Sequence, residues 1–471
     1  MLHKYLVVFL LTLRTVFADG AGGGTIVRFD PTNPQTGPFP ADSLTVPDTT
    51  EITGKRVNLP LPDCTALPTL CGQLALINQL DGFNVQPRIT VAFSGPVDTS
   101  TLRAGIFFVA LDNLTADEIG LQRTGDTVAI NQVVYDPVTN TVYAKPDASL
   151  DQHRRYVLVI TDAIRDTSGN PIGADPAFPA CATASTPSSY CADLANVLAV
   201  AQATSNHIVA ASIFTTQSAT AWLESARRGL QCMPVVVRHP DGQYVFNIAN
   251  VANLGVNFDT GSGKFSSFNL PIGSPQYSYF FGSLGRVAFL SYLSPLLLNS
   301  QQTIDASPTG VDVVVPTPAN EVAFHVYLPN SPAPPNGYPV VIFGHGFGDS
   351  SIGAPTVVSP ALAQAGFATI AINAVGHGFG PKSNLVLTDN SGNSTTVLLG
   401  GRGADLNGDG AIDATEGCEI LTPLAIGLRD CIRQTVVDLT QLVRVIRAGL
   451  DVDGDGTPDL EIGRASCRER V

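Results

Sequence analysis

Residues 339–348 read Pro-Val-Val-Ile-Phe-Gly-His-Gly-Phe-Gly, and residues 366–378 read Gly-Phe-Ala-Thr-Ile-Ala-Ile-Asn-Ala-Val-Gly-His-Gly. Each stretch contains an unbroken apolar run, which is typical of a strand buried on both faces of a parallel sheet. Between the two runs, residues 357–365 have the apolar spacing of a helix, and Gly366 follows as a helix stop. The order of strand, glycine-rich loop, helix and strand predicts a βαβ unit of a doubly wound α/β sheet.

This pattern of a buried strand, H-G-x-G, a helix, a second strand and G-H-G resembles the N-terminal half of an α/β-hydrolase. The resemblance implies that the loop of His345, Gly346, Phe347 and Gly348 supplies one backbone N–H of an oxyanion hole. Phe347 is the candidate donor, because glycines on both sides leave its amide free to face a developing alkoxide. The alternative is a glycine-rich turn that serves packing only. His345 and His377 are interpreted as structural, since the catalytic His of this family comes near the end of the fold.

The serine nucleophile of this family stands in G-x-S-x-G, and no such pentapeptide occurs in the 471 residues. Residues 282–285 read Gly-Ser-Leu-Gly, but Phe281 stands where the first glycine is needed. Residues 424–450 predict a long amphipathic helix with an apolar stripe formed by Leu428, Ile432, Val436, Leu439, Val443 and Ile446. In the family, a helix of this kind precedes the strand that carries the nucleophile.

The last ten residues, 462–471, read IGRASCRERV and resemble one reading frame of a short-read sequencing adapter. A natural basic tail is the alternative. If the adapter interpretation holds, the natural protein sequence differs from the given one after about Glu461. That point lies one strand before the expected catalytic serine. On this interpretation the chain as written is inactive.

Two acidic loops follow the pattern of calcium-binding loops. Residues 405–416 fit D-x-[DN]-x-[DN]-G-x5-E in full, which predicts a structural Ca²⁺ site rather than a solvated acidic loop. The predicted oxygen ligands are Asp405, Asn407, Asp409, Ala411 through its carbonyl, Asp413 and Glu416. A second loop begins in the same way and offers Asp451, Asp453, Asp455, Thr457 and Asp459. Its twelfth position is Ile462, so its last ligand is left open.

The N-terminal region has the pattern of an exported β-rich protein. Residues 1–18 combine His3 and Lys4, a short apolar run and a small residue at Ala18, which predicts a cleaved signal peptide rather than a buried helix. Short apolar runs bounded by turn residues then predict strands at 89–93, 106–109, 128–130, 142–144, 156–160 and 213–215. Residues 91–102, 156–161 and 166–170 resemble bacterial Ig-like modules of secreted and surface-layer proteins, and residues 188–204 have the spacing of an inserted helix. Further along, the alternation at 321–328 predicts an edge hairpin.

Composition limits the compartment and the partners. A formal net charge of −14 disfavours nucleic acid and anionic membrane surfaces as partners, and nucleic acid is excluded because the sequence has no local basic patch. No apolar stretch is long enough to span a bilayer. The closely spaced cysteines predict three local disulfides in an oxidising compartment: Cys64 with Cys71, Cys181 with Cys191, and Cys418 with Cys431. Cys232 has no near partner in the sequence.

These observations predict a multidomain chain. We expect a signal peptide at 1–18, an extended lead-in at 19–84, an Ig-like β domain at 85–217, a linker helix and β-rich region at 218–330, half of an α/β-hydrolase at 331–461, and an artefact at 462–471. The favoured function is a secreted carboxylic-ester hydrolase, similar to lipases and esterases, that acts on ester or lipid-like substrates. The alternative is a calcium-stabilised adhesion or surface-layer module without catalysis.

Overall fold

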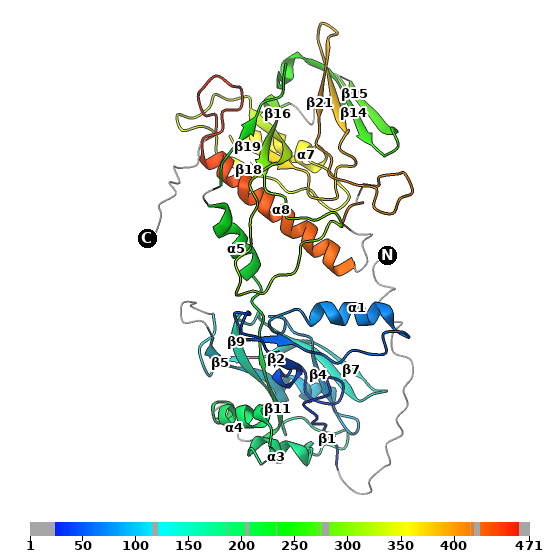
Figure 1. Cartoon of the computed structure of the whole chain (residues 1–471), viewed down its shortest axis with the longest axis vertical. Helices are drawn as coiled ribbons and strands as arrows, with labels where there is room; N and C mark the ends of the chain where they lie inside the picture. Colours follow the sequence, from blue (N-terminus) through cyan, green and yellow to red (C-terminus); the bar gives the residue numbers. More distant parts are fainter. Residues whose placement is uncertain are drawn as a thin grey trace. The chain divides into compact units, whose positions relative to one another are not determined.

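The computed structural model describes residues 24–114, 121–185, 187–202, 207–231, 233–271, 273–275, 282–414, 416–418 and 424–460. The predicted signal peptide, the tail after residue 461 and Cys232 lie outside these residues. The chain divides into unit 1, residues 1–59 and 80–219, and unit 2, residues 60–79 and 220–471 (Figure 1). In the part of the chain that is described, no helix has both the length and the apolar character needed to cross a membrane.

Unit 1 is built from two sheets that share one hydrophobic core. The strand orders are β11-β9-β5-β6 and β4-β8-β7. The strands are β4 (Ile89–Ala92), β5 (Ile106–Asn113), β6 (Thr127–Val128), β7 (Ile130–Asp136), β8 (Thr141–Pro146), β9 (Arg154–Thr161) and β11 (Ile208–Thr215). Side chains alternate along β9, so Tyr156, Leu158 and Ile160 lie in the shared core while Val157 and Val159 face the other way. The strands predicted for the Ig-like region are confirmed.

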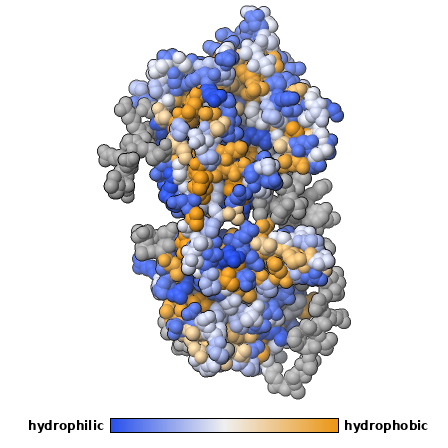
Figure 2. All heavy atoms as spheres, viewed as in Figure 1, coloured by the Kyte–Doolittle hydropathy of each residue, from blue (hydrophilic) through white to orange (hydrophobic). Residues whose placement is uncertain are grey.

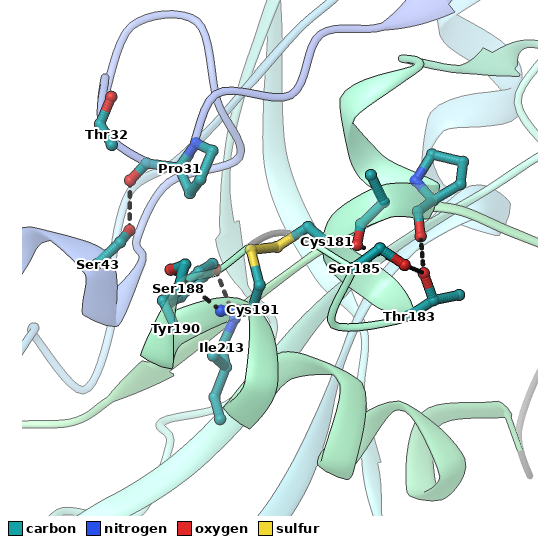
Figure 3. The surroundings of a disulfide bond; sticks show 12 residues. Pro31, Thr32, Ser43, Cys181, Thr183, Ser185, Ser188, Tyr190, Cys191 and Ile213 are labelled. Carbon is teal, nitrogen blue, oxygen red and sulfur yellow. Dashed lines mark hydrogen bonds between the residues drawn. A yellow bond between two sulfur atoms is a disulfide. The ribbon is translucent and has the colours of Figure 1, made fainter.

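Two helices cover the outer face of the larger sheet: α3 (Ala177–Ala182) and α4 (Ser189–Gln202). The Cys181–Cys191 disulfide joins them, and Figure 3 shows Tyr190 beside it, where its hydroxyl accepts a 3.3 Å hydrogen bond from the Ile213 amide. All three predicted disulfides are present, the others being Cys64–Cys71 and Cys418–Cys431. The inserted helix predicted at 188–204 is confirmed as α4.

The predicted extended lead-in is only partly extended. Its short elements are β1 (Ile26–Val27), which pairs with β10 (Gly173–Ala174), η1 (Asp42–Leu44), β2 (Thr45–Pro47), β3 (Lys55–Val57) and α1 (Pro68–Ile77). Val27, Leu44 and Val57 are buried in the core of unit 1. Leu44 and Val57 are flanked by polar residues, and Val27 has only Ile26 as an apolar neighbour, so no local periodicity reveals their burial. Unit 1 is completed by η2 (Thr99–Thr101) and α2 (Leu102–Gly105).

Unit 2 contains one mixed sheet with the order β12-β16-β17-β19-β18 and β13 paired to β16. The strands are β12 (Val237–Arg238), β13 (Val245–Asn247), β16 (Leu284–Ser294), β17 (Asn320–Pro329), β18 (Val340–Ile342) and β19 (Ala368–Ile372). β18 and β19 are parallel, and β17 is antiparallel to β19. The helix α7 (Ala354–Gln364) connects β18 to β19. The predicted βαβ unit is therefore present.

Two expectations about this sheet are wrong. The alternation at 321–328 predicts an edge hairpin, but β17 lies between β16 and β19 and is largely buried. The predicted domain border at 330/331 falls inside the sheet, because β16 and β17 pair with the strands that follow it. The boundary between units lies at 219/220, just before α5 (Ala221–Leu230). The alternation of polar and apolar residues does not distinguish an edge strand from an inner strand such as β17, which begins with polar residues and is buried toward its end.

A second sheet of unit 2 has the order β15-β14-β20-β21. It contains β14 (Val251–Asp259), which follows η3 (Ile248–Asn250), together with β15 (Phe265–Pro271), β20 (Asn384–Asp389) and β21 (Ser394–Leu398), and Figure 1 shows β14, β15 and β21 together. Its inner residues, including Leu254, Val256 and Leu385, share a core with α7 and with Val287, Phe289 and Tyr327 of the mixed sheet. The helix α7 therefore lies on the same face of the mixed sheet as the second sheet.

The helix α8 (Leu424–Arg447) packs on the opposite face of the mixed sheet, against Leu290, Phe324 and Ile370. Its buried side is partly polar: Asp430, Gln434, Asp438 and Gln441 are all 0 % exposed. These side chains bond to loops at the sheet edge, for example Gln434 with Leu297 N and Pro295 O, and Asp430 with Ile304 N. Leu428 and Ile432, in contrast, are 42 % and 55 % exposed. The predicted apolar stripe is thus wrong over the first half of the helix, because satisfied polar groups replace it.

Apolar atoms also remain visible among hydrophilic ones on the face of the molecule drawn in Figure 2. Apolar atoms normally contribute more than half of the accessible surface of a folded protein, so their presence alone does not mark a binding site.

The Cys181–Cys191 bond allows a test of the packing in unit 1. Replacing both cysteines by alanine should lower the free energy of unfolding of unit 1 by about 2–3 kcal/mol, since a bond closing a ten-residue separation restrains the unfolded chain by that order. Urea denaturation followed by circular dichroism measures the loss. The same replacement at Cys64 and Cys71, which belong to unit 2, serves as the control and should leave unit 1 unchanged. An equal effect of both pairs on unit 1 would contradict the prediction.

Candidate functional site

The predicted oxyanion loop lies at the carboxyl end of β18. Backbone pairing with β19 ends with the hydrogen bond from Phe343 N to Ile370 O at 2.8 Å. His345, Gly346, Phe347 and Gly348 follow as one loop that leads to α7. The structure therefore brings the four predicted residues together, at the sheet edge where parallel strands present their carboxyl ends.

His345 anchors this loop to the next one. Its Nε2 accepts a 3.0 Å hydrogen bond from the Ala374 amide, which follows β19, and its Nδ1 lies 2.9 Å from the Gly346 carbonyl. This pattern requires a neutral ring that donates from Nδ1. Burial lowers the pKa of His345, and the nearby His377 lowers it further, against the favourable carbonyl of Gly346. His345 is thus a positioning residue, in agreement with its structural interpretation.

The amides of the loop are free. Within the described residues, the five consecutive N–H groups of residues 344–348 have no hydrogen-bond acceptor. The Phe347 side chain is 68 % exposed and makes an edge contact with the His377 ring at 5.5 Å. Gly344, Phe347 and the glycines beside Phe347 are exposed, while His345 is half-buried. A run of unpaired amides can donate to an anionic oxygen without first breaking protein hydrogen bonds.

The glycines of the two loops differ in what surrounds them. A Cβ at Gly344 or Gly346 would meet nothing within 4 Å. A Cβ at Gly376 would lie 2.6 Å from Cys418 Sγ, and one at Gly378 would lie 2.5 Å from Asn373 Oδ1. The G-H-G segment therefore needs its glycines for packing, whereas the glycines before Phe347 leave open space in front of the backbone.

A buried polar network holds both loops on α8. Asn373 accepts from Ser351 N at 2.7 Å and donates to the Leu399 and Gly400 carbonyls, both at 2.9 Å. Arg402 donates to the Asn373 carbonyl and forms an ion pair of 2.7 Å with Asp438 on α8. The site is consequently placed by groups that are largely removed from water.

The first acidic loop is closed by its own carboxylates. Asp405 accepts from Gly408 N and Gly410 N at 2.7 and 2.8 Å, and Glu416, only 1 % exposed, accepts from Leu406 N at 2.9 Å. Asn407 and Asp409 accept in turn from the amides two residues further on. Asp413 is exposed and Ala411 half-buried, and Ile412 donates its amide to Thr260 O on the turn between β14 and β15.

The second loop repeats this arrangement. Asp451 accepts from Gly454 N and Gly456 N at 2.7 and 2.8 Å, and Asp455 accepts from Thr457 N at 2.7 Å. Oxygens of Asp451, Asp453 and Asp459 come within 4.8 Å of one another. Arg286 pairs with Asp453 at 2.6 Å and with Asp459 at 3.4 Å. Burial raises the pKa of Asp459, against the hydrogen bond from Val452 N.

A serine, a histidine and an aspartate also meet in unit 1, and the sequence pattern did not reveal them. Ser218 Oγ lies 2.6 Å from His153 Nδ1 and donates to Asp81, and all three residues are less than 9 % exposed. The serine stands between the other two, and its proton is held by the carboxylate rather than by the imidazole. A catalytic triad needs the imidazole in the middle. This cluster is therefore a structural network.

Comparison with known proteins identifies the N-terminal part. Residues 77–180 match the family of bacterial Ig-like domains, Big_5. The match supports an Ig-like domain in the N-terminal part of the chain, and nearly all of it falls in unit 1. A search of curated proteins gives no match. The Ig-like match does not reach the predicted hydrolase region, so the hydrolase interpretation depends on the geometry of unit 2.

Some solved structures show weak likeness. They include the N-terminal part of the bacterial S-layer protein SbsC, at 14 % identity over 23 % of this chain and 26 % of that chain, with a TM-score of 0.15. The S-layer protein rSbsC(31-844) matches at 9 % identity over 70 % of this chain and 36 % of that chain, with a TM-score of 0.16. The chain thus covers well under two thirds of these proteins. Scores of this size support no argument about fold or function.

The fully buried His325 of β17 gives a test of pH dependence in unit 2. Burial lowers its pKa from 6.5 to about 4, although the Ser351 backbone slightly favours the charged ring. Between pH 6.5 and about pH 4, His325 is protonated in the unfolded chain but neutral in the folded chain. The free energy of unfolding therefore falls as the pH drops through this window. The loss should reach about 3 kcal/mol.

Urea denaturation at pH 7 and pH 4 measures this loss. In the His325→Leu variant the part of the acid loss caused by this ring should disappear, so the difference from the parent protein should shrink by about that amount. His207→Gln, at an exposed histidine, is the control and should keep the full acid loss. Equal acid sensitivity of the parent and His325→Leu proteins would show that His325 titrates normally.

Proposed function

We propose that unit 2 is the first part of an α/β-hydrolase-type domain, and that the loop at 344–348 binds the oxyanion formed during ester hydrolysis. The observation that carries the proposal is the run of five unpaired amides, among the described residues, at the carboxyl end of β18. The predicted signal segment and the three disulfides support export of the protein.

The strand order supports this placement. The connection β18–α7–β19 moves toward β17, and α8 lies on the other face of the sheet. Because parallel crossovers are right-handed, a crossover through α8 leads in the opposite direction, toward the free edge of β18. The loop after β18 would then stand where the strand order reverses, which is the usual ligand position in open α/β sheets.

The chemistry assigned to the loop is electrostatic. In acyl transfer, a serine attacks the ester carbonyl and negative charge develops on its oxygen. The Phe347 amide would donate to that oxygen, and the exposed glycines on either side would let the substrate approach the backbone. The proposal requires a serine nucleophile with its base and acid from sequence beyond residue 461, since the 471 residues contain no G-x-S-x-G.

The natural gene, amplified from genomic DNA, tests the proposal. Its product should hydrolyse p-nitrophenyl esters, and a fluorophosphonate probe should label one serine in a G-x-S-x-G sequence. A product without esterase activity and without a labelled serine would overturn the hydrolase assignment.

Phe347 allows the oxyanion role to be tested in that product. Phe347→Pro removes the N–H and should lower kcat about 10²- to 10³-fold, the usual cost of losing one oxyanion donor. Phe347→Ala keeps the N–H and removes only an exposed side chain, so it should stay within about threefold of the parent kcat. Steady-state kinetics and a melting curve of each variant separate catalysis from folding. Equal kcat values for the two variants would contradict the assignment.

A second candidate function is a surface-layer or adhesion module without catalysis. The match of residues 77–180 to bacterial Ig-like domains favours it, and this part of the chain has the better support from known proteins. Fluorescently labelled protein would bind washed cells or isolated cell walls saturably if this function holds. Absence of such binding, together with esterase activity, would favour the hydrolase.

We further propose that the two acidic loops bind structural Ca²⁺. Both loops turn through glycines with positive φ, at Gly408, Gly410, Gly454 and Gly456, and both use their first aspartate to accept two backbone amides. Several carboxylate and amide oxygens are thereby held on each short loop, and oxygens are the ligands that Ca²⁺ requires. Among the described residues, the carboxylate oxygens that converge within 4.8 Å are those of Asp451, Asp453 and Asp459 in the second loop, where Arg286 partly neutralises them. The first loop contributes the buried Glu416.

Calcium should stabilise the protein if this is correct. At 10 mM Ca²⁺ a site with millimolar or sub-millimolar affinity should raise the free energy of unfolding by about 2 kcal/mol, and the melting temperature by a few degrees. Thermal melts with Ca²⁺, Mg²⁺ and EGTA measure the effect. Asp409→Asn together with Asp455→Asn should abolish it, whereas Asp241→Asn, an exposed aspartate outside the loops, should keep it. Equal melting temperatures in Ca²⁺ and in EGTA would contradict the proposal that the loops bind calcium.

A further inference from the structure

Unit 2 contains an apolar cavity that neither the loop nor the calcium sites use. Its volume is about 300 Å³. It lies between the second sheet, the start of α7 and the strands β16 and β17, and its walls include Leu254, Val256, Leu385, Phe289 and Ile352. We infer that this cavity binds one linear aliphatic chain, such as that of a fatty alcohol, a fatty acid or an ester.

The described lining is almost entirely apolar. The polar side chains in the wall are those of Tyr327 and Thr356, whose hydroxyls lie 2.8 Å apart, and Thr356 also donates to Ile352 O at 2.7 Å. Among the described residues, no charged side chain lines the cavity. An apolar wall of this kind offers water few hydrogen-bond partners and favours apolar ligands. Recognition must therefore come from the removal of hydrocarbon from water.

The cavity has an entrance from solvent. Two of its lining residues are exposed, Phe268 on β15 to 51 % and Val357 on α7 to 40 %. β15 is an edge strand of the second sheet and is exposed along most of its length. We place the entrance at these two exposed side chains of the lining.

The shape of the wall depends on specific residues. Leu254 and Val256 alternate with Gly255 along β14, so both point inward. Gly353 faces the cavity before α7, and a Cβ there would lie 1.7 Å from Asp349 Oδ1, which holds the preceding turn. The missing side chain at Gly353 therefore makes room for Asp349, whose hydrogen bond from Ala354 N fixes this part of the wall.

This inference is independent of ester hydrolysis, because it concerns binding by the 471-residue chain itself. Residues 344–348 and the cavity wall at Ile352 belong to the same connection between β18 and α7. If the hydrolase proposal also holds, the aliphatic chain is part of the substrate. If it fails, the cavity remains a binding site.

Competition against a fluorescent long-chain fatty acid, with alcohols and carboxylates of six to twelve carbons, tests the inference. We expect one site per chain and an affinity that rises about fourfold for each added methylene until the cavity is full. Decanol should bind at least as tightly as decanoate, since the described lining carries no charge. Decanoate binding without decanol binding would instead indicate a charged surface site and overturn the inference.

Variants at the entrance and inside locate the site. Val357→Trp should weaken decanol binding at least tenfold by blocking the entrance, and Ala361→Trp, on an exposed position one turn later, should change it less than twofold. Val256→Phe should fill the interior and also weaken binding. Val357 is exposed, so its variant should fold even if Val256→Phe does not. Absence of saturable binding, or binding that Val357→Trp leaves unchanged, would overturn the inference.

Discussion

The architecture of unit 2 depends on the position of β19 between β17 and β18. β19 is antiparallel to β17 and parallel to β18, and all five of its residues are buried. The parallel pair brings the ends of β18 and β19 to the same edge, so the two following loops meet there. The hydrogen bond from Ala374 N to His345 is the direct consequence. Without this strand order, the open amides after Phe343 would have no fixed support.

The βαβ unit, the three disulfides and the internal pattern of the acidic loops could be predicted from the sequence, because each is determined by residues close together in the chain. The short segments around Ile106 and Ile342 have β-branched, apolar runs bounded by glycine, proline or aspartate, and they form strands as expected. The position of the loop at 344–348 could be predicted for the same reason, since its glycines follow a strand directly. Whether those amides were free could not be known, because that depends on what the rest of the chain puts near them.

The parts that could not be predicted arise from pairing between distant segments. β14 pairs with β20, which lies far away in the sequence, and neither segment carries a local signal for the other. The cavity forms only where that second sheet lies over α7. The polar face of α8 is another case. Periodicity assumes that buried positions are apolar, but the buried Gln434 and Gln441 bond to backbone groups of loops and of β16. A side-chain amide that is hydrogen-bonded to backbone carbonyls can occupy a buried helix position where periodicity predicts an apolar residue.

The connection between β18 and α7 performs two distinct tasks with few residues. In its first half, Gly344 and Gly346 have no side chains, so the backbone is accessible. In its second half, Asp349 accepts a hydrogen bond from Ala354 N, and Ile352 lines the cavity. Rigid anchors lie on both sides, with His345 bonded to Ala374 and Ser351 bonded to Asn373. An exposed loop that is fixed at both ends loses little conformational freedom when a ligand binds. The geometry thus favours a preformed binding surface. On the two proposals made above, the loop amides would bind the polar group of a ligand, and the adjacent apolar cavity would bind its hydrocarbon chain.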